Sequence, residues 1–311
     1  MVNLLDILSK EERTALSLCA LYAEYGYQPY RMSKFEEYDL YVKNKDFLVS
    51  ENVITFTDTD GRLLALKPDV TLSIIKNSRE TGGALNKVYY NERVYRVSKG
   101  TRSFKEIMQA GLECFGEVDE KTVVETLYLA GKSLDEIAEE NMLEISHLDV
   151  IAGVLDAVGA SVDASREIVR LLGEKNSQAI ADVCDKENLG EEQKSLLNKL
   201  VSAYGSPKKV LPVLETFCVN ERATAGVRQL QSILDGLQKL GMEEKICVDF
   251  SVVNDMNYYN GIAFKGFVEN VPVGVLSGGQ YDGLMKKMGK GAKAIGFAVY
   301  LDEISKLGER I

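Results

Sequence analysis

The distribution of strand-like and helix-like segments along the chain most constrains its fold. Short runs rich in Val, Ile and Tyr, typical of strands, occupy both ends of the sequence, whereas residues 161–240 contain almost none. In that middle part, apolar residues recur at helical spacing, for example Leu197, Leu200, Val201 and Tyr204. This distribution favours an α+β protein with a mostly antiparallel sheet flanked by helices over a doubly wound parallel sheet. We predict one domain from residues 1–160 and 241–311, with residues 161–240 as a helical insertion.

Charge and hydropathy exclude several classes of partner. The chain has 37 Lys and Arg against 47 Asp and Glu, a formal net charge of −10, which is the wrong sign for affinity that comes from neutralising phosphates. No run approaches the roughly 20 apolar residues of a membrane span, and the N-terminus lacks a basic start followed by an apolar signal core. We therefore expect no nucleic-acid partner, no membrane partner and a cytoplasmic location.

The cysteines and the single histidine argue against a metal site. No two of the five cysteines form a Cys-x-x-Cys pair, and His147 is the only histidine, so the usual zinc spacings cannot be assembled. We predict that all five are small buried hydrophobic residues: Cys19, Cys114, Cys184, Cys218 and Cys247.

Several local elements can be predicted from residue type. Residues 11–25 have helical spacing that ends at Gly26, with a candidate buried face of Leu16, Cys19, Ala20 and Ala23. Pro68 and Asp69 are typical of a helix start, because proline has no N–H to lose there and a carboxylate favours the positive end of the helix. Residues 271–276 have the Val-rich composition of a strand.

Four short segments combine polar side chains with turn or strand signals. They are Leu66 to Thr71, Gln109 to Glu113, Tyr258 to Gly261, and Gly278-Gly279. Each has an ordinary structural interpretation: a helix start, an exposed strand face, a hairpin turn, and a bulge or tight turn. Alternation along a strand would nevertheless place Gln109, Gly111 and Glu113 on one face, with an amide and a carboxylate above a glycine.

These segments belong to four stretches that, in this order, resemble the catalytic domain of histidyl-tRNA synthetases, which have a class II aminoacyl-tRNA synthetase fold. The stretches are Leu66 to Thr71, Tyr90 to Gly116, Asn254 to Gly261 and Ser277 to Ala298. The resemblance covers most of the chain outside the middle insertion. It implies a histidine pocket whose lining includes Asp69, Thr71, Gln109, Glu113, Tyr258 and Tyr259. In such a pocket a carboxylate and a hydroxyl receive the ligand's α-ammonium group, and a second carboxylate with a tyrosine hydroxyl holds the imidazole nitrogens.

The departures from the family pattern concentrate on cations. Family arginines correspond here to Asn254, Gln280 and Glu303, and the loop that usually reads Arg-x-Glu-Arg-Pro keeps only its first arginine, Arg96. Removing a cation that stabilises the transition state of phosphoryl-type chemistry can cost about 10³ to 10⁵ in rate. We therefore expect no adenylation and no catalytic residues. Because the chain ends at Ile311, we also expect no anticodon-reading domain.

This combination resembles the regulatory subunits of ATP phosphoribosyltransferase, which partner its short-form catalytic subunit in the first step of histidine biosynthesis. The resemblance implies a subunit without chemistry or cofactor of its own. It also implies a homodimer within a hetero-octamer, an activating role, and histidine as the feedback effector. The ligand carboxylate would then be held by Arg96, by Gln109 or by a partner.

Two other functions are compatible with the same residues. A divergent histidyl-tRNA synthetase fragment would still form histidyl-adenylate, with Arg96 and Arg102 holding phosphates. Alternatively, a pseudo-synthetase would sense amino acids for a different protein partner. Histidine-dependent pyrophosphate exchange separates the first of these from a regulatory subunit.

Overall fold

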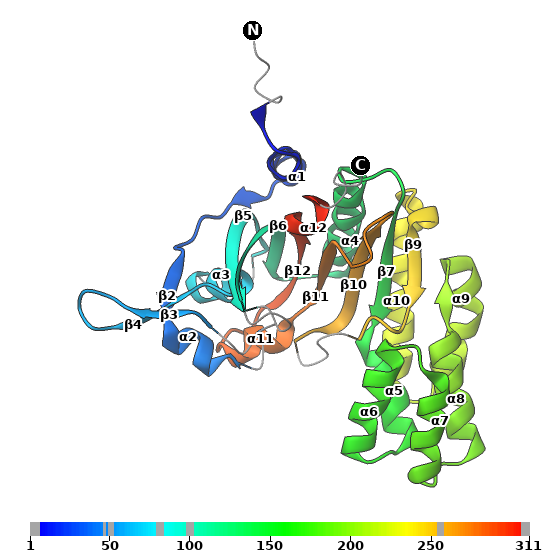
Figure 1. Cartoon of the computed structure of the whole chain (residues 1–311). Helices are drawn as coiled ribbons and strands as arrows, with labels where there is room; N and C mark the ends of the chain where they lie inside the picture. Colours follow the sequence, from blue (N-terminus) through cyan, green and yellow to red (C-terminus); the bar gives the residue numbers. More distant parts are fainter. Residues whose placement is uncertain are drawn as a thin grey trace.

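A single large sheet forms the centre of the molecule (Figure 1). The computed structural model describes residues 7–45, 48, 53–78, 84–97, 103–253 and 258–305. The sheet has nine strands in the order β1-β5-β6-β12-β11-β10-β7-β9-β8, and only the pairs β1–β5 and β7–β9 are parallel. The predicted mostly antiparallel α+β architecture is therefore confirmed. The strands are β1 (Gln28–Pro29), β5 (Asn86–Val97), β6 (Phe104–Gly116), β7 (Asn141–His147), β8 (Tyr204–Gly205), β9 (Ile246–Asp249), β10 (Asn260–Val268), β11 (Leu276–Gln280) and β12 (Lys293–Tyr300).

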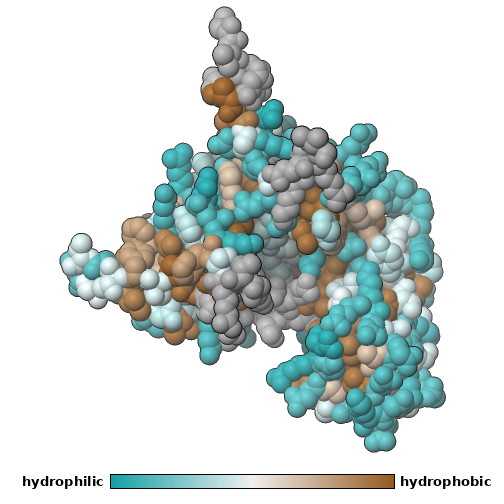
Figure 2. Space-filling model, viewed as in Figure 1, coloured by the Kyte–Doolittle hydropathy of each residue, from teal (hydrophilic) through white to brown (hydrophobic). Residues whose placement is uncertain are grey.

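A small three-stranded sheet projects beside the large one and contains the predicted hairpin. Its order is β2 (Phe35–Glu37), β4 (Leu63–Leu66) and β3 (Thr55–Thr57), all antiparallel. The Asp58 carboxylate accepts hydrogen bonds from the backbone N–H groups of Asp60 and Arg62, which holds the β3–β4 turn. Apolar side chains are exposed on this sheet, as the brown surface over it in Figure 2 shows: Phe35, Phe56 and Leu63.

The two faces of the large sheet have different cover. Along β6, alternate residues Ala110, Leu112 and Cys114 join the main hydrophobic core, which also includes α1 (Lys10–Glu24) and α4 (Glu120–Asp135). The opposite face carries Gln109, Gly111, Glu113 and Phe115, because side chains alternate along a strand. A smaller core lies on that second face, together with α3 (Thr71–Asn77) and α11 (Asp282–Lys287). The short helix α2 (Tyr38–Lys43) joins this smaller core through Tyr41, whereas α12 (Leu301–Ser305) joins the main core through Leu301 and Ile304.

The first helix lies where it was predicted, but its predicted buried face is wrong. The buried residues of α1 are Thr14, Ala15, Leu18 and Tyr22, whereas Leu16 is 53% exposed and Ala20 and Ala23 are exposed. Both sets have helical spacing, so periodicity alone does not choose between them. Tyr22 decides the orientation: its hydroxyl lies 2.9 Å from Ser133 Oγ on α4, and its ring makes an edge contact with Phe297.

Residues 161–240 are largely helical, as predicted (Figure 1). Helix α5 (Leu148–Val158) precedes this region. Its own helices are α6 (Val162–Gly173), α7 (Ser177–Lys186), α8 (Glu191–Ser202), α9 (Pro207–Leu214) and α10 (Glu221–Lys239), with a short 3₁₀ turn at Glu215–Phe217 and another just after the region at Glu243–Lys245. One short strand, β8, leaves the helical segment to pair with β9. Apolar residues of α10 and α5 belong to the same core as the sheet, so hydrophobic packing is continuous across the predicted boundary.

Three smaller predictions need correction. Helix α3 begins at Thr71 rather than at Pro68, although Asp69 Oδ1 does accept a hydrogen bond from Leu72 N, 2.9 Å away, at its start. Residues 271–275 are not strand, and β11 begins at Leu276. Pro272 has no N–H to contribute to a ladder, and within this stretch Val275 N bonds to β10, donating to the Gly266 carbonyl over 2.8 Å. Among the cysteines, Cys114, Cys184 and Cys247 are buried, but Cys19 is half-buried and Cys218 is exposed.

Candidate functional site

The floor of the candidate site follows from the register of three neighbouring strands. In the β6–β12 pairing Glu113 lies opposite Gly296, Gly111 opposite Ala298, and Gln109 opposite Tyr300. In the β12–β11 pairing Gly296 lies opposite Gly279, and Ala298 opposite Ser277. Directly paired residues point to the same face of a sheet. The floor of the site, meaning this face of β11 and β12 beside Glu113, therefore consists of Gly279, Gly296, Ala298 and Ser277. It ends at Tyr300.

Glycine is required under Glu113 by the close approach of the carboxylate. A Cβ at Gly296 would lie 1.8 Å from Glu113 Oε2, far inside van der Waals contact. Two more glycines are needed for contacts with tyrosines. A Cβ at Gly279 would lie 2.7 Å from the ring of Tyr259, and a Cβ at Gly111 would lie 2.6 Å from the Tyr90 hydroxyl. The glycines expected to form a bulge or a tight turn, Gly278 and Gly279, instead lie inside β11.

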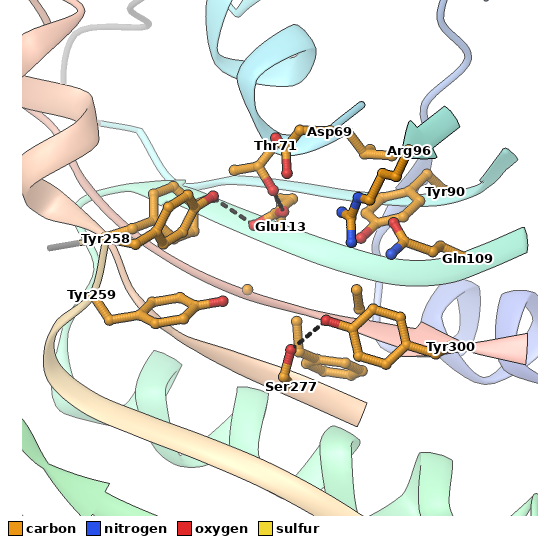
Figure 3. A pocket seen from close by; sticks show the side chains of 15 residues that line it. Asp69, Thr71, Tyr90, Arg96, Gln109, Glu113, Tyr258, Tyr259, Ser277 and Tyr300 are labelled. Carbon is orange, nitrogen blue, oxygen red and sulfur yellow. Dashed lines mark hydrogen bonds between the residues drawn. The ribbon is translucent and has the colours of Figure 1, made fainter. Parts of the chain in front are cut away.

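Glu113 is buried and held by two hydroxyl groups. Thr71 Oγ1 donates to its Oε1 over 2.6 Å, and the Tyr281 hydroxyl donates to its Oε2 over 2.5 Å. Thr71 comes from the start of α3, and Tyr281 follows β11, so two distant segments meet at this carboxylate. Figure 3 shows Thr71 and Asp69 on one side of the cavity and Tyr258 and Tyr259 at one end.

A buried ion pair anchors the segment that carries Asp69 and Thr71. Lys67 Nζ lies 2.5 Å from Glu92 Oε2, and only 1% of the Lys67 side chain is exposed. The Lys67 carbonyl also accepts a hydrogen bond from Tyr95 N. Arg96 adds a further link, because its Nε donates to the Pro68 carbonyl over 2.9 Å. These three contacts tie the segment after β4 to β5, and so fix where Asp69 and Thr71 lie.

These segments enclose a cavity of about 560 Å³, including its open mouth. It is lined by Asp69, Val70, Thr71, Tyr90, Arg96, Gln109, Glu113, Tyr258, Tyr259, Ser277, Tyr281, Gly296, Phe297, Ala298 and Tyr300. Arg96 is the one cationic side chain in this set, against two carboxylates. At the end of the cavity beside Arg96, Tyr300 and Ser277 are joined by a hydrogen bond of 2.6 Å between their hydroxyl groups (Figure 3).

Burial controls the charge of the two carboxyl groups. Loss of water raises the pKa of Glu113 to about 8; its hydrogen bonds from Thr71 and Tyr281 oppose that rise, and the charge of Asp69 adds to it. Burial also raises the pKa of Asp69, against the N–H of Leu72 and the positive charge of Arg96. Among the described residues no cation is paired with Glu113. The cavity thus presents a carboxyl group that a basic ligand would ionise.

All seven residues predicted for the pocket line this one cavity: Asp69, Thr71, Arg96, Gln109, Glu113, Tyr258 and Tyr259. Sequence reasoning missed Tyr90, Ser277, Tyr281 and Tyr300. Ser277 alternates with Gly279 on β11, and Tyr300 alternates with Ala298 on β12. This alternation was a usable signal for these two residues, but only once the strand order was known.

The positions that replace family arginines have different surroundings. Gln280 is buried outside the cavity lining, and its Oε1 accepts a hydrogen bond from Ile262 N over 3.0 Å. It fills a bulge in β10 where Gly261 has φ of +62° and a Cβ would lie 2.4 Å from that oxygen. Glu303 lies on α12 and does not line the cavity. Asn254 and Arg102 lie outside the described residues.

Metal and membrane features are not found in the described part of the chain. No group of three or more His, Cys, Asp or Glu residues there is placed to hold a metal ion. His147 is buried, and its Nε2 lies 2.9 Å from Gln229 Oε1 in the helical region. No helix within the described ranges has the length and hydropathy needed to cross a membrane.

Comparison with solved structures places this architecture among known folds. A Bacillus halodurans protein described as an ATP phosphoribosyltransferase regulatory subunit/histidyl-tRNA synthetase superposes with a TM-score of 0.82 at 24% identity, covering 98% of this chain and 81% of that one. An ATP phosphoribosyl transferase complex from Thermotoga maritima contains a chain that matches with a TM-score of 0.74 at 18% identity, covering 94% of this chain and 98% of that one. The fold is therefore that of the class II aminoacyl-tRNA synthetases.

Sequence comparison narrows this class to a family. A sequence profile described as histidyl-tRNA synthetase matches residues 4–304. The ATP phosphoribosyltransferase regulatory subunit of Caldanaerobacter subterraneus is 30% identical over 290 residues, which cover 91% of this chain and 75% of that protein. The chain belongs to the histidyl-tRNA synthetase family, in the group of the ATP phosphoribosyltransferase regulatory subunits.

Proposed function

We propose that this chain is a regulatory, non-catalytic subunit of ATP phosphoribosyltransferase. In this role it activates a short-form catalytic subunit and transmits feedback inhibition by histidine, which binds in the cavity over β6, β11 and β12. It works as a homodimer within a hetero-octamer. The names of its relatives and the assembly in the Thermotoga maritima structure support the partner, and the residues of the cavity support the effector.

The observation that carries the proposal is the charge inventory of the cavity. Two buried carboxyl groups, an amide and several hydroxyls surround a space with a single arginine. A zwitterion with a basic side chain matches this inventory. Its α-ammonium group meets Asp69 and Thr71, its imidazole meets Glu113 and a tyrosine hydroxyl, and its carboxylate meets Arg96 and Gln109. A triphosphate, with several negative charges, would face the same two carboxyl groups with one cation to offset them.

Feedback requires that histidine bind two states of the assembly with different affinity. A ligand with equal affinity for both states shifts nothing, however tightly it binds. A coupling free energy of about 1 to 3 kcal/mol is enough for histidine to shift the equilibrium between an active and an inactive assembly by 5- to 150-fold. Thr71 and Tyr281 link Glu113 to α3 and to the segment after β11, so a ligand at Glu113 is connected through hydrogen bonds to elements outside the sheet.

The direct test mixes this protein with a short-form catalytic subunit and measures formation of phosphoribosyl-ATP with and without histidine. We expect a gain in rate on mixing and a loss of that gain when histidine is added. No gain in rate on mixing would refute the activating role. Incorporation of labelled pyrophosphate into ATP, dependent on histidine, would instead identify an adenylate-forming enzyme.

The effector site is tested separately by Glu113→Ala. We expect this variant to activate the catalytic subunit as the parent protein does, but to lose inhibition by histidine, because the carboxyl group that meets the imidazole is gone. The matched control is Glu106→Ala on the same strand, where the side chain is exposed and faces away from the cavity. Unchanged inhibition in Glu113→Ala would show that histidine binds elsewhere.

A further inference from the structure

One end of the cavity is closed by a pair of hydroxyl side chains. Tyr300 is the last residue of β12 and lies directly opposite Gln109 on β6. Its hydroxyl group lies 2.6 Å from Ser277 Oγ on β11. Ser277 pairs with Ala298, so the Tyr300 side chain reaches diagonally from β12 to β11. This hydrogen bond holds the ring over the end of the floor rather than out in solvent.

Tyr300 differs in size from the other residues on this face of β11 and β12. The neighbouring floor positions are Gly279, Gly296, Ala298 and Ser277, whose side chains leave the space above them open. Among the β11 and β12 residues that line up with Glu113, Gly111 and Gln109 on this face of the sheet, Tyr300 is therefore the one with a large side chain. A ligand lying over the glycines can extend toward Tyr300 and must stop there.

The charges of the cavity tell which end of the ligand faces this wall. Glu113 attracts the basic group of the ligand, whereas Arg96 and Gln109 offer donors to its carboxylate. Figure 3 shows Arg96 and Gln109 on one side of the cavity end and Ser277 and Tyr300 on the other. The carboxyl group of a bound amino acid thus lies between these two pairs, and any group attached to that carboxyl would need the space of the Tyr300 ring.

We propose that the Ser277–Tyr300 pair is the specificity determinant that restricts this site to a free amino acid and excludes amino acids extended at the carboxyl group, such as amides with bulky substituents, esters or adenylates. This inference rests on the proposed function, since it assumes that the cavity binds an amino acid. Tyr300 contributes steric exclusion, and the hydrogen bond to Ser277 holds its ring in the excluding position.

The test compares two ligands that differ only in bulk at the carboxyl end: histidinamide and histidine benzylamide. Both lack the carboxylate charge, so the ratio of their dissociation constants, measured by isothermal titration calorimetry, reports steric exclusion alone. In the parent protein we expect the benzylamide to bind about 10- to 200-fold more weakly. In Tyr300→Ala that ratio falls to near one, and in Ser277→Ala it falls part of the way, because the ring is free to swing.

Controls separate this inference from the proposed function. Tyr204→Ala removes a tyrosine from the far edge strand of the sheet and leaves the ratio unchanged. Thermal melts establish that each variant is folded. If the parent protein binds both amides with similar affinity, the exclusion is wrong even though the site binds histidine. If the parent protein binds neither histidine nor histidinamide, the proposed function itself fails.

Discussion

At the scale of single residues, Glu113 defines the site. It is a carboxyl group placed over a glycine, sealed from water and held by two hydroxyl donors, with no cation paired to it among the described residues. Such a group is costly to ionise without a basic ligand. An empty cavity therefore favours the protonated form, and a bound imidazolium or ammonium group favours the charged form. Ligand recognition and proton loss are coupled at one side chain.

This coupling predicts how the stability of the ligand-free protein depends on pH. Because the pKa of Glu113 is about 8 in the folded state and 4.5 without burial, the folded state holds more protons between these values. The free energy of unfolding therefore falls as pH rises from about 4.5 to about 8, by on the order of a few kcal/mol from this group. Urea denaturation at pH 5 and pH 8.5 measures the difference.

Glu113→Gln should flatten this pH dependence, since an amide does not ionise. Glu106→Gln, which changes an exposed residue of the same strand, should keep the slope of the parent protein. Equal slopes in Glu113→Gln and the parent protein would assign the pH dependence to other groups, Asp69 first among them because burial also raises its pKa.

At the scale of elements, strand register determines which side chains meet in the cavity. Alternation along one strand was enough to put Gln109, Gly111 and Glu113 on one face, and the structure confirms it. It was not enough to find Ser277 and Tyr300, because their place depends on β12 pairing with β6 and on β11 pairing with β12. The first of these pairings joins segments that are distant in sequence. The wrong face of α1 has the same cause: Tyr22 is buried by contacts with Ser133 and Phe297, both distant in sequence.

Register also predicts the effect of one added methyl group in β12. Gly296→Ala places a Cβ where Glu113 Oε2 now lies, so the carboxylate has to move and lose its hydrogen bonds from Thr71 and Tyr281. A hydrogen bond to a charged group contributes about 1.5 to 3 kcal/mol, so we expect histidine affinity to fall by roughly 10- to 150-fold. Calorimetric titration measures this change.

The control for this variant is Gly283→Ala. Gly283 lies in α11, and a Cβ there would meet nothing within 4 Å. Its histidine affinity should equal that of the parent protein. Full affinity in Gly296→Ala would mean that the ligand does not depend on the present position of Glu113.

At the scale of the whole molecule, the helical segment and the sheet share one hydrophobic core. The sequence marked residues 161–240 as different in composition, but it gave no indication of how their helices dock. In the structure, the ring of Phe217 packs edge-on against Phe250, with centroids 5.6 Å apart, and β8 pairs with β9. Burial of apolar surface is the main favourable term in folding. The division into a domain and a helical insertion stays a prediction. Because the two parts share one core, we expect them to unfold together.

An ion pair at this junction allows a test of that expectation. Lys175, after α6, lies 2.7 Å from the carboxylate of Asp249 on β9, and the Asp249 side chain is only 3% exposed. Lys175→Met leaves a buried carboxylate without its cation, which should cost about 2 kcal/mol. Because the core is continuous, we expect scanning calorimetry to show one transition, shifted as a whole to lower temperature. Lys208→Met, which breaks an exposed pair with Glu243, should cost less than about 1 kcal/mol. A separate early transition in Lys175→Met would show instead that the helical segment unfolds independently of the sheet.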